Sequence, residues 1–127
     1  DNPEWTGIAS RFAWRMKLQD KELINFRMSF TNRETYESRL IEAKTFLTNN
    51  QYKHLADDPL NFVHLARYLQ SRIEQETNII NPEINATVEL RFNGLPKQFL
   101  FDPKLDLLNV EEKKLKNGTW LYPLKKE

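Results

Sequence analysis

The sequence predicts an α+β domain with an antiparallel sheet of about five strands, in the order β-β-β-α-α-β-β, and two helices packed on one face. Three observations lead to this class. Apolar and polar residues alternate in several short segments, as expected for half-buried strands. In mid-sequence the apolar spacing changes to that of an amphipathic helix. Short turns rather than long crossovers separate the strand-like segments, which favours antiparallel pairing.

Two strand patterns lie near the start of the chain, at residues 12–18 and 24–30. A hairpin through residues 20–22 would place the apolar residues of both strands on one face. After a turn at residues 31–34, we expect a shorter strand at residues 36–41. The apolar residues of the first two strands are Phe12, Trp14, Met16, Leu18, Ile24, Phe26, Met28 and Phe30.

The helical part begins at residues 48–51, which have the Thr-x-x-Gln form of a capping box and predict a short helix to about Ala56. Asp58 is the expected N-cap of the next helix, with Pro59 at its first position. This second helix is expected to run to about Gln75. Its apolar stripe consists of Phe62, Leu65, Ala66, Leu69 and Ile73.

The clearest strand pattern covers residues 84–92, and Asn93-Gly94 after it is typical of a tight type I′ hairpin. A two-residue turn places Val88 opposite Phe99 and sets Ala86 opposite Phe101, while Asp102-Pro103 ends the return strand. The helices are expected to cover the sheet face lined by Trp14, Phe26, Met28, Val88 and Phe99. Towards the C-terminus, residues 110–116 suit a helical turn or a loop, and the apolar residues 120–124 are expected to dock.

Composition limits the classes of function. The 127 residues suit a single domain over residues 1–127, and the net charge of +1 gives no support for a nucleic-acid partner. There is no cysteine, which excludes disulfides, thiolate catalysis and cysteine-based zinc sites. No apolar run approaches the roughly 18 residues of a membrane-spanning helix. The chain begins at Asp1 without Met, so we expect it to be excised from a larger multi-pass membrane protein.

No catalytic or metal-binding residue is predicted. The only histidines, His54 and His64, lie on different expected helices and are best interpreted as solvent-facing or helix-packing side chains. Asp57-Asp58 and the pair Asp102 and Asp106 have local capping or turn roles that explain them without catalysis. The motifs of nucleotide-binding loops, serine hydrolases and zinc proteases are absent.

One group of cations is the candidate binding site. The alternation places Arg11, Arg15, Arg27 and Arg91 on the sheet face opposite the apolar side. Such a patch would receive acidic groups through charge-assisted hydrogen bonds. The alternative is an ordinary solvated face, balanced by Glu89 and Glu37.

Several segments, in collinear order, resemble the vitamin K-dependent gamma-carboxylases and their bacterial relatives, the HTTM proteins. The similar segments are Arg11-Phe12-Ala13-Trp14-Arg15-Met16, Phe46-Leu47-Thr48-Asn49-Asn50-Gln51, Pro59 with Ala66, Tyr68 and Leu69, Val88 to Gln98, Phe101-Asp102-Pro103-Lys104-Leu105-Asp106-Leu107 and Trp120-Leu121-Tyr122-Pro123-Leu124. In that family these segments form a soluble domain outside the cytoplasm, or in the lumen of the endoplasmic reticulum, that follows a multi-pass helical part.

The resemblance implies that carboxylation chemistry, its lysine base and the vitamin K hydroquinone cofactor belong to the helical part of the full-length protein. The isolated domain is then expected to be inactive and to hold no cofactor. The expected partners are its own transmembrane domain and a Glu-containing polypeptide substrate. The expected location is the extracytoplasmic side of a bacterial membrane, adjacent to the lipid but not inserted.

Three hypotheses follow. In the first, the domain helps to bind or position a substrate protein, through Arg11, Arg15, Arg27 and Arg91. In the second, it is a structural or interaction domain that only stabilises its membrane part. In the third and weakest, it is an RNA-binding sheet, although the β-α-β-β-α-β order of such domains is missing.

Overall fold

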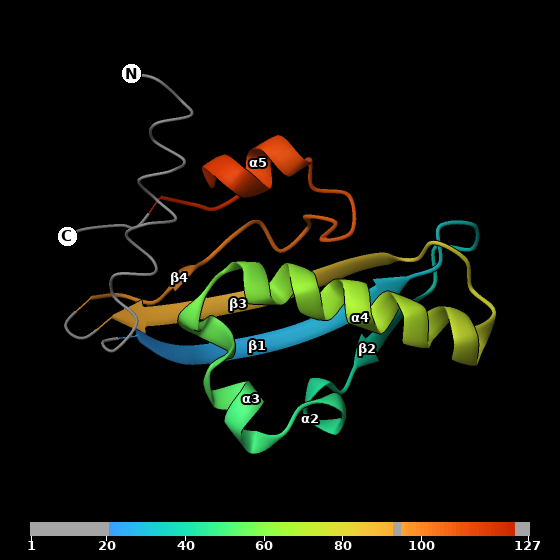
Figure 1. Cartoon of the computed structure of the whole chain (residues 1–127), viewed down its shortest axis with the longest axis horizontal. Coiled ribbons are helices and arrows are strands. Elements are labelled where there is room, and N and C mark those ends of the chain that lie inside the picture. Colours follow the sequence, from blue (N-terminus) through green and yellow to red (C-terminus); the bar gives the residue numbers. More distant parts are fainter. Residues whose placement is uncertain (1–20, 93–94, 124–127) are drawn as a thin grey trace.

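The computed structural model describes residues 21–92 and 95–123, and it has the expected α+β architecture (Figure 1). One antiparallel sheet has the strand order β2-β1-β3-β4. Its strands are β1 (Lys21–Thr31), β2 (Ser38–Ile41), β3 (Glu83–Phe92) and β4 (Gln98–Phe99). The described part thus contains four strands where about five were expected. The strand expected at residues 12–18, and its hairpin to β1, lie outside the described residues.

Helices cover one side of this sheet, with α4 lying across β1 and β3 (Figure 1). The helices are α2 (Ala43–Phe46), α3 (Asn49–Lys53), the 3-10 helix η2 (Leu55–Asp57), α4 (Leu60–Thr77) and α5 (Glu112–Asn117). The predicted pair corresponds to α3 and α4, α5 is the helical turn considered for residues 110–116, and the short helix α2 was not predicted. Among the residues that the structure describes, no helix combines the length and apolar character needed to cross a membrane.

The central pair of strands, β1 and β3, joins two distant parts of the sequence. Their register places Phe26 opposite Val88 and Phe30 opposite Ile84. Val88 and Ile84 are fully buried, and Phe30 is nearly so, whereas the alternate residues of β3 are more accessible. The period-two pattern is therefore confirmed for β3 and for β1 from Phe26 onwards, because one face of the pair packs on the helices. A register shift between Leu23 and Asn25 interrupts the pattern before that point, so Leu23 rather than Ile24 packs against the core.

The predicted start of the first helix is confirmed, and the second helix begins at Leu60, one residue later than predicted, with Pro59 rather than Asp58 in the N-cap position. The Thr48 hydroxyl accepts a hydrogen bond of 3.0 Å from the backbone N–H group of Gln51. The side-chain oxygen of Gln51 accepts one of 2.9 Å from the backbone N–H group of Thr48, which completes a capping box. Asp58 Oδ1 accepts a hydrogen bond of 3.0 Å from the backbone N–H group of Leu60. Pro59 has helical torsion angles of φ −53° and ψ −30°, and α4 is assigned from the next residue.

Aromatic rings connect the sheet, α4 and the C-terminal segment. Phe62 of α4 packs edge-on against Phe26, with ring centroids 5.4 Å apart, and against Phe101 at 6.0 Å. Phe101 in turn lies 5.4 Å from Trp120. Every residue of the predicted α4 stripe is buried, and Val63 joins it. The core therefore lies between the sheet and α4, closed by the C-terminal residues.

The predicted register of the β3–β4 hairpin is wrong by one residue. Glu89 lies opposite Phe99 and Leu90 opposite Gln98, whereas the two-residue turn had placed Val88 opposite Phe99. A shift of one residue moves a side chain to the other face of the sheet. Phe99 accordingly leaves the core and is 38% exposed.

Proline explains why pairing starts late. Pro96 has no N–H group to donate to a ladder, and the assigned strand begins only at Gln98. The register then follows burial, because Leu100 and Phe101 are almost fully inaccessible. The prediction that Phe101 packs in the core is thus confirmed, although the partner assigned to Phe99 is not. Residues 93 and 94, which carry the predicted turn, lie outside the described residues.

The chain after β4 continues along β3 and then folds back. The N–H group of Leu107 donates to the carbonyl of Ile84 at 2.9 Å, and the N–H group of Tyr122 donates to the carbonyl of Leu100 at 2.9 Å. Trp120 and Leu121 are buried. The expected docking of the C-terminal apolar segment is confirmed for these residues.

Candidate functional site

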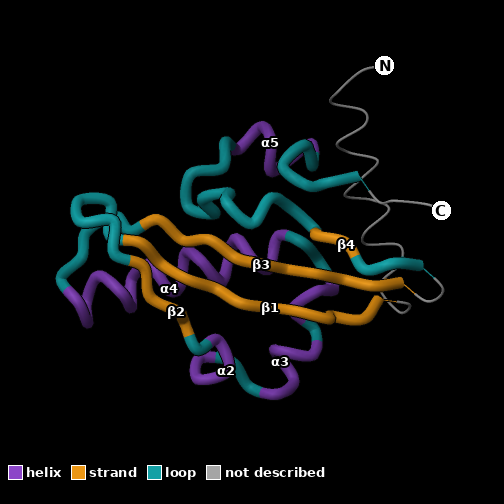
Figure 2. The backbone as a smooth tube through the Cα atoms, turned by 180° about the vertical axis from the view of Figure 1, so that it is seen from behind, coloured by secondary structure: helices purple, strands orange, loops and turns teal. Residues whose placement is uncertain are grey.

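The candidate site is the sheet face that the helices leave uncovered, which we call the open face. Figure 2 shows the molecule from behind, where no described helix lies in front of β1 and β3. Side chains that alternate with the buried ones reach this face from both strands. The open face carries Asn25, Arg27 and Ser29 from β1 and Asn85, Thr87, Glu89 and Arg91 from β3.

The structure places two of the predicted cations on the open face but does not gather them into one cluster. Arg27 lies opposite Thr87 in the register, and Arg91 lies four residues further along β3. At the usual rise per residue, this separates their backbones by roughly 13 Å. The other two predicted cations, Arg11 and Arg15, lie outside the described residues.

The two arginines differ in their surroundings. Arg91 Nη2 lies 2.9 Å from Glu22 Oε1, in an ion pair whose side chains are both more than half exposed. Arg27 is exposed and makes no hydrogen bond or ion pair within residues 21–92 and 95–123. Arg27 is therefore better placed than Arg91 to bind an external acidic group, to which its guanidinium can donate hydrogen bonds.

A carboxylate occupies the middle of the open face. The side chain of Glu89 is only 16% exposed, accepts a hydrogen bond of 2.7 Å from Asn25 Nδ2, and lies 3.9 Å from Lys97 Nζ. The open face thus carries both signs of charge. Any anion that binds it must approach Arg27 from the side away from Glu89.

A shallow hollow of about 160 Å³ lies beside Arg27. Its polar lining comes from Arg27, Ser29, Asn85 and Thr87, and Leu40 and Pro103 form apolar walls. Asn85 Nδ2 is already committed to the carbonyls of Lys104 and Leu105, at 3.1 and 3.0 Å. The guanidinium and the two hydroxyls remain as donors, which is a set that suits a carboxylate.

Sequence reasoning missed a groove that contains both histidines. It has a volume of about 520 Å³ and lies between α3 and α4. Its lining includes His54, His64, Gln51, Asn61, Leu65 and Tyr68. The sequence feature that could have indicated this groove is the short connection between the two predicted helices. In the structure this connection is η2, which folds α3 back beside the start of α4.

The histidine groove shows no catalytic arrangement. His54 Nδ1 lies 2.8 Å from Asp57 Oδ2, both histidines are exposed as expected, and no histidine–nucleophile pair is formed between described residues. The described residues also contain no group of three or more His, Cys, Asp or Glu side chains that could hold a metal ion.

Lys21 is a titratable group that the sequence did not single out. Burial lowers the pKa of Lys21 from 10.5 to about 8, and this outweighs Asp57 and Asp58, which act in the opposite direction. Its Nζ atom donates to the carbonyl of Ala56 at 2.6 Å. Lys21 therefore ties the start of β1 to η2 and has a structural role there.

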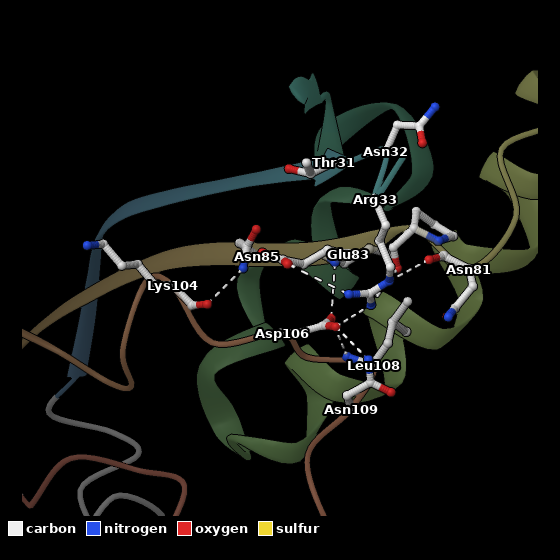
Figure 3. A network of polar contacts seen from close by, with 12 residues as sticks. Thr31, Asn32, Arg33, Asn81, Glu83, Asn85, Lys104, Asp106, Leu108 and Asn109 are labelled. Atoms are coloured by element: carbon white, nitrogen blue, oxygen red, sulfur yellow. Dashed lines mark hydrogen bonds and ion pairs between the residues drawn. The ribbon is translucent and has the colours of Figure 1, made fainter. Parts of the chain in front are cut away.

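A polar network joins the hairpin loop after β1, the start of β3 and the loop after β4 (Figure 3). Arg33 pairs with Asp106, and its Nε atom donates to the carbonyl of Asn81 at 2.7 Å. Asp106 also accepts hydrogen bonds from the backbone N–H groups of Ile84 and Leu108, at 3.2 and 3.1 Å. The network holds loops in place rather than presenting a reactive group.

Asp102 and Asp106 do not form a carboxylate pair. Asp102 Oδ1 accepts a hydrogen bond of 2.9 Å from the backbone N–H group of Lys104, in the turn role expected from the sequence. Asp106 is held by the network with Arg33.

The fold and its exposed polar face define a small α+β domain with an open antiparallel sheet and a helical layer behind it. A family model described as "Vitamin K-dependent gamma-carboxylase, lumenal domain" matches residues 1–127. The chain belongs to this family, and the resemblance seen in the sequence is confirmed. The family description places the domain on the lumenal, extracytoplasmic side of its membrane. A comparison with solved structures finds no match.

Proposed function

We propose that the chain is the extracytoplasmic domain of a bacterial carboxylase-like membrane protein, where it helps to bind or position a Glu-containing polypeptide. Arg27 and Arg91, together with Arg11 and Arg15, contact acidic groups of that polypeptide in this proposal. The domain is not catalytic alone. Its own transmembrane part is the second partner, and the domain lies adjacent to the membrane without inserting.

One observation carries the proposal. Arg27 is an exposed cation without a described acceptor, beside a hollow whose other free donors are the hydroxyls of Ser29 and Thr87. A guanidinium and hydroxyls arranged around a small hollow are suited to a carboxylate such as a glutamate side chain. The open face gives an extended polypeptide room to lie across it (Figure 2).

Vitamin K hydroquinone is proposed only for the full-length protein, in its membrane part. The described lysine with a lowered pKa, Lys21, already donates to the carbonyl of Ala56 and does not line the hollow beside Arg27. No residue of the described domain is therefore assigned to the cofactor or to the carboxylation step.

Charge reversal in the full-length protein tests this function. We expect the double variant Arg27→Glu with Arg91→Glu to weaken association with a Glu-containing polypeptide by about tenfold or more, since each reversal replaces an attraction by a repulsion. Arg67→Glu is the matched control, because Arg67 lies on α4 and pairs with Glu112 at 3.2 Å. Equal affinity of the double variant and the wild type would refute the proposal.

A purely structural domain is the second candidate, and the mixed charge of the open face favours it. Arg91 is paired with Glu22, and Glu89 lies in the middle of the face with Asn25 and Lys97 around it. For such a domain, deletion lowers the abundance of the membrane protein but leaves its choice of substrate unchanged. Quantifying both properties separates the two candidates.

A further inference from the structure

We propose that the edge strand β2 receives an acidic segment of the partner polypeptide as an additional β-strand, with one of its carboxylates in the hollow beside Arg27. This inference rests on the proposed function and specifies where and how the polypeptide binds. It concerns Ser38–Ile41, which the candidate cations did not include.

Strand β2 is an edge strand. It lies at the end of the strand order β2-β1-β3-β4 and pairs only with β1 within the described sheet. Such an edge has backbone N–H and C=O groups without ladder partners on its outer side. In Figure 2 the outer side of β2 is not covered by another described strand.

The hydrogen-bond pattern identifies the outward groups. The N–H group of Asn32 donates to the carbonyl of Glu37 at 2.9 Å, so this is a hydrogen-bonded position of the antiparallel pair. These positions alternate along the ladder, and the next ones on β2 are Arg39 and Ile41, opposite Phe30 and Met28. The residues whose backbone groups point away from β1 are therefore Ser38 and Leu40.

The β2 edge lacks proline, lysine and a bulge, although it is short and carries the cation Arg39. Leu40 is 70% exposed, and Ser38 and Arg39 are also exposed. Ser38–Ile41 contains no proline or lysine, and its pairing with β1 shows no bulge. Proline, lysine and bulges are features by which proteins commonly block pairing at a sheet edge. Its short length limits an added strand to a few residues, as in peptide recognition by β-strand addition.

The hollows beside the β2 edge carry more positive than negative charge. The hollow beside Arg27 also has Leu40 in its wall, so it adjoins the β2 edge directly. A neighbouring hollow of about 310 Å³ is lined by Arg27, Leu40, Glu42 and Lys44. The charged residues that line the two hollows are thus two cations and one carboxylate. This net positive charge favours an acidic occupant over a neutral or basic one.

A second copy of the chain fits this edge less well. Pairing of two β2 strands would bring together two copies of Ser38–Ile41, a segment whose only charged residue is Arg39. No carboxylate of that segment would reach Arg27, and cations of the two copies would approach each other. The occupant is therefore a separate acidic segment in extended conformation.

The test uses the full-length protein in lipid nanodiscs and a synthetic peptide of alternating valine and glutamate, with the valine–glutamine peptide for comparison. Hydrogen–deuterium exchange is measured with and without each peptide. We expect the valine–glutamate peptide to slow exchange in the segment that contains Ser38 and Leu40, because their outward N–H groups become hydrogen-bonded. Slowing that is confined to other segments would overturn the proposal.

Two variants distinguish the backbone from the charge. Leu40→Pro removes an outward N–H group and should abolish the slowed exchange, whereas Leu40→Thr keeps that group and should retain it. Arg27→Gln should weaken binding of the valine–glutamate peptide by about tenfold and leave the valine–glutamine peptide unaffected. Because Arg27→Gln leaves the backbone of β2 intact, this comparison holds even if Leu40→Pro disturbs the strand.

The outcomes separate this inference from the function on which it rests. If charge reversal weakens polypeptide association while Leu40→Pro binds the peptide as the wild type does, the function stands and the strand addition is wrong. If charge reversal has no effect, the function itself fails. If Leu40→Pro instead converts a dimer of the protein into a monomer, the edge pairs with a second copy and the proposal is overturned.

Discussion

Arg33 and Asp106 form an ion pair across 73 positions of the sequence, and this pair fastens the hairpin loop after β1 to the loop that follows β4. Asp106 is only 16% exposed and additionally accepts hydrogen bonds from the backbone of Ile84 and from Asn109. One carboxylate thus serves donors from three separate segments. Its removal leaves several partly buried donors without an acceptor.

We therefore expect Asp106→Ala to lower the free energy of unfolding by about 2 to 4 kcal/mol, because it removes acceptors for Ile84, Leu108 and Arg33. Asp102→Ala is the control, since Asp102 is exposed and makes a single turn bond to Lys104. Its cost should stay below about 1 kcal/mol. Urea unfolding of both variants measures the difference, and equal losses would contradict the role given to Asp106.

The corrected register of β4 predicts opposite outcomes for two phenylalanines. Phe101 is fully buried between Phe62 and Trp120, so Phe101→Ala should cost about 3 to 5 kcal/mol. Phe99 is 38% exposed on the open face, and Phe99→Ala should cost below about 1 kcal/mol. Thermal unfolding compares them. A large loss for Phe99→Ala would restore the register expected from a two-residue turn.

Lys21 predicts how stability depends on pH. Because burial lowers its pKa from 10.5 to about 8, the folded chain releases this proton at a lower pH than the unfolded chain does. Between these values the unfolded state binds more protons, so the contribution of Lys21 to the free energy of unfolding rises with pH. It is lost again as the pH falls through about 8.

Lys21→Met should therefore remove part of the rise in stability between pH 8 and pH 10, as measured by urea unfolding at several pH values. The matched control is Lys53→Met, which replaces an exposed lysine of α3. Identical pH profiles for the two variants would show that Lys21 does not titrate differently in the folded chain.

The capping box at the start of α3 makes a local prediction. Thr48→Ala removes the acceptor of the Gln51 N–H bond and should cost about 1 kcal/mol. Thr45→Ala, in the preceding helix, is the comparison, since its side chain is exposed and caps no helix. If both threonines can be replaced at equal cost, the capping interaction does not contribute to stability.

Local patterns predicted the elements that depend on neighbours in the sequence. The capping box, the α4 stripe, the alternation in β3 and most of the alternation in β1 were confirmed, because helix and strand periods follow from which side is buried. The register shift between Leu23 and Asn25 was not predicted. The register of β4 was predicted wrongly, because Pro96 delays pairing. The burial of Leu100 and Phe101 then determines which side chains of this segment face the core. This is a tertiary effect that a turn motif alone does not contain.

The candidate site was predictable only in part. Alternation placed Arg27 and Arg91 on the correct face, but the pairing of Arg91 with Glu22 depends on the register between distant strands. The histidine groove depends on how η2 folds α3 against α4. The accessibility of Leu40 for strand addition depends on the position of β2 at the sheet edge, which no local pattern specifies.

The pairing of β1 with β3 also governs how this chain must fold. The two strands cannot meet until the loop from residue 32 to residue 82, which contains α2, α3 and α4, has closed. The entropy of closing that loop is lost before the central contacts can compensate for it, so folding is governed by non-local contacts and is slow. During synthesis, the core of the sheet cannot form before β3 has emerged from the ribosome. Until then, β1 can pair with β2, but its other edge, which pairs with β3, has no ladder partner and can be bound by a chaperone.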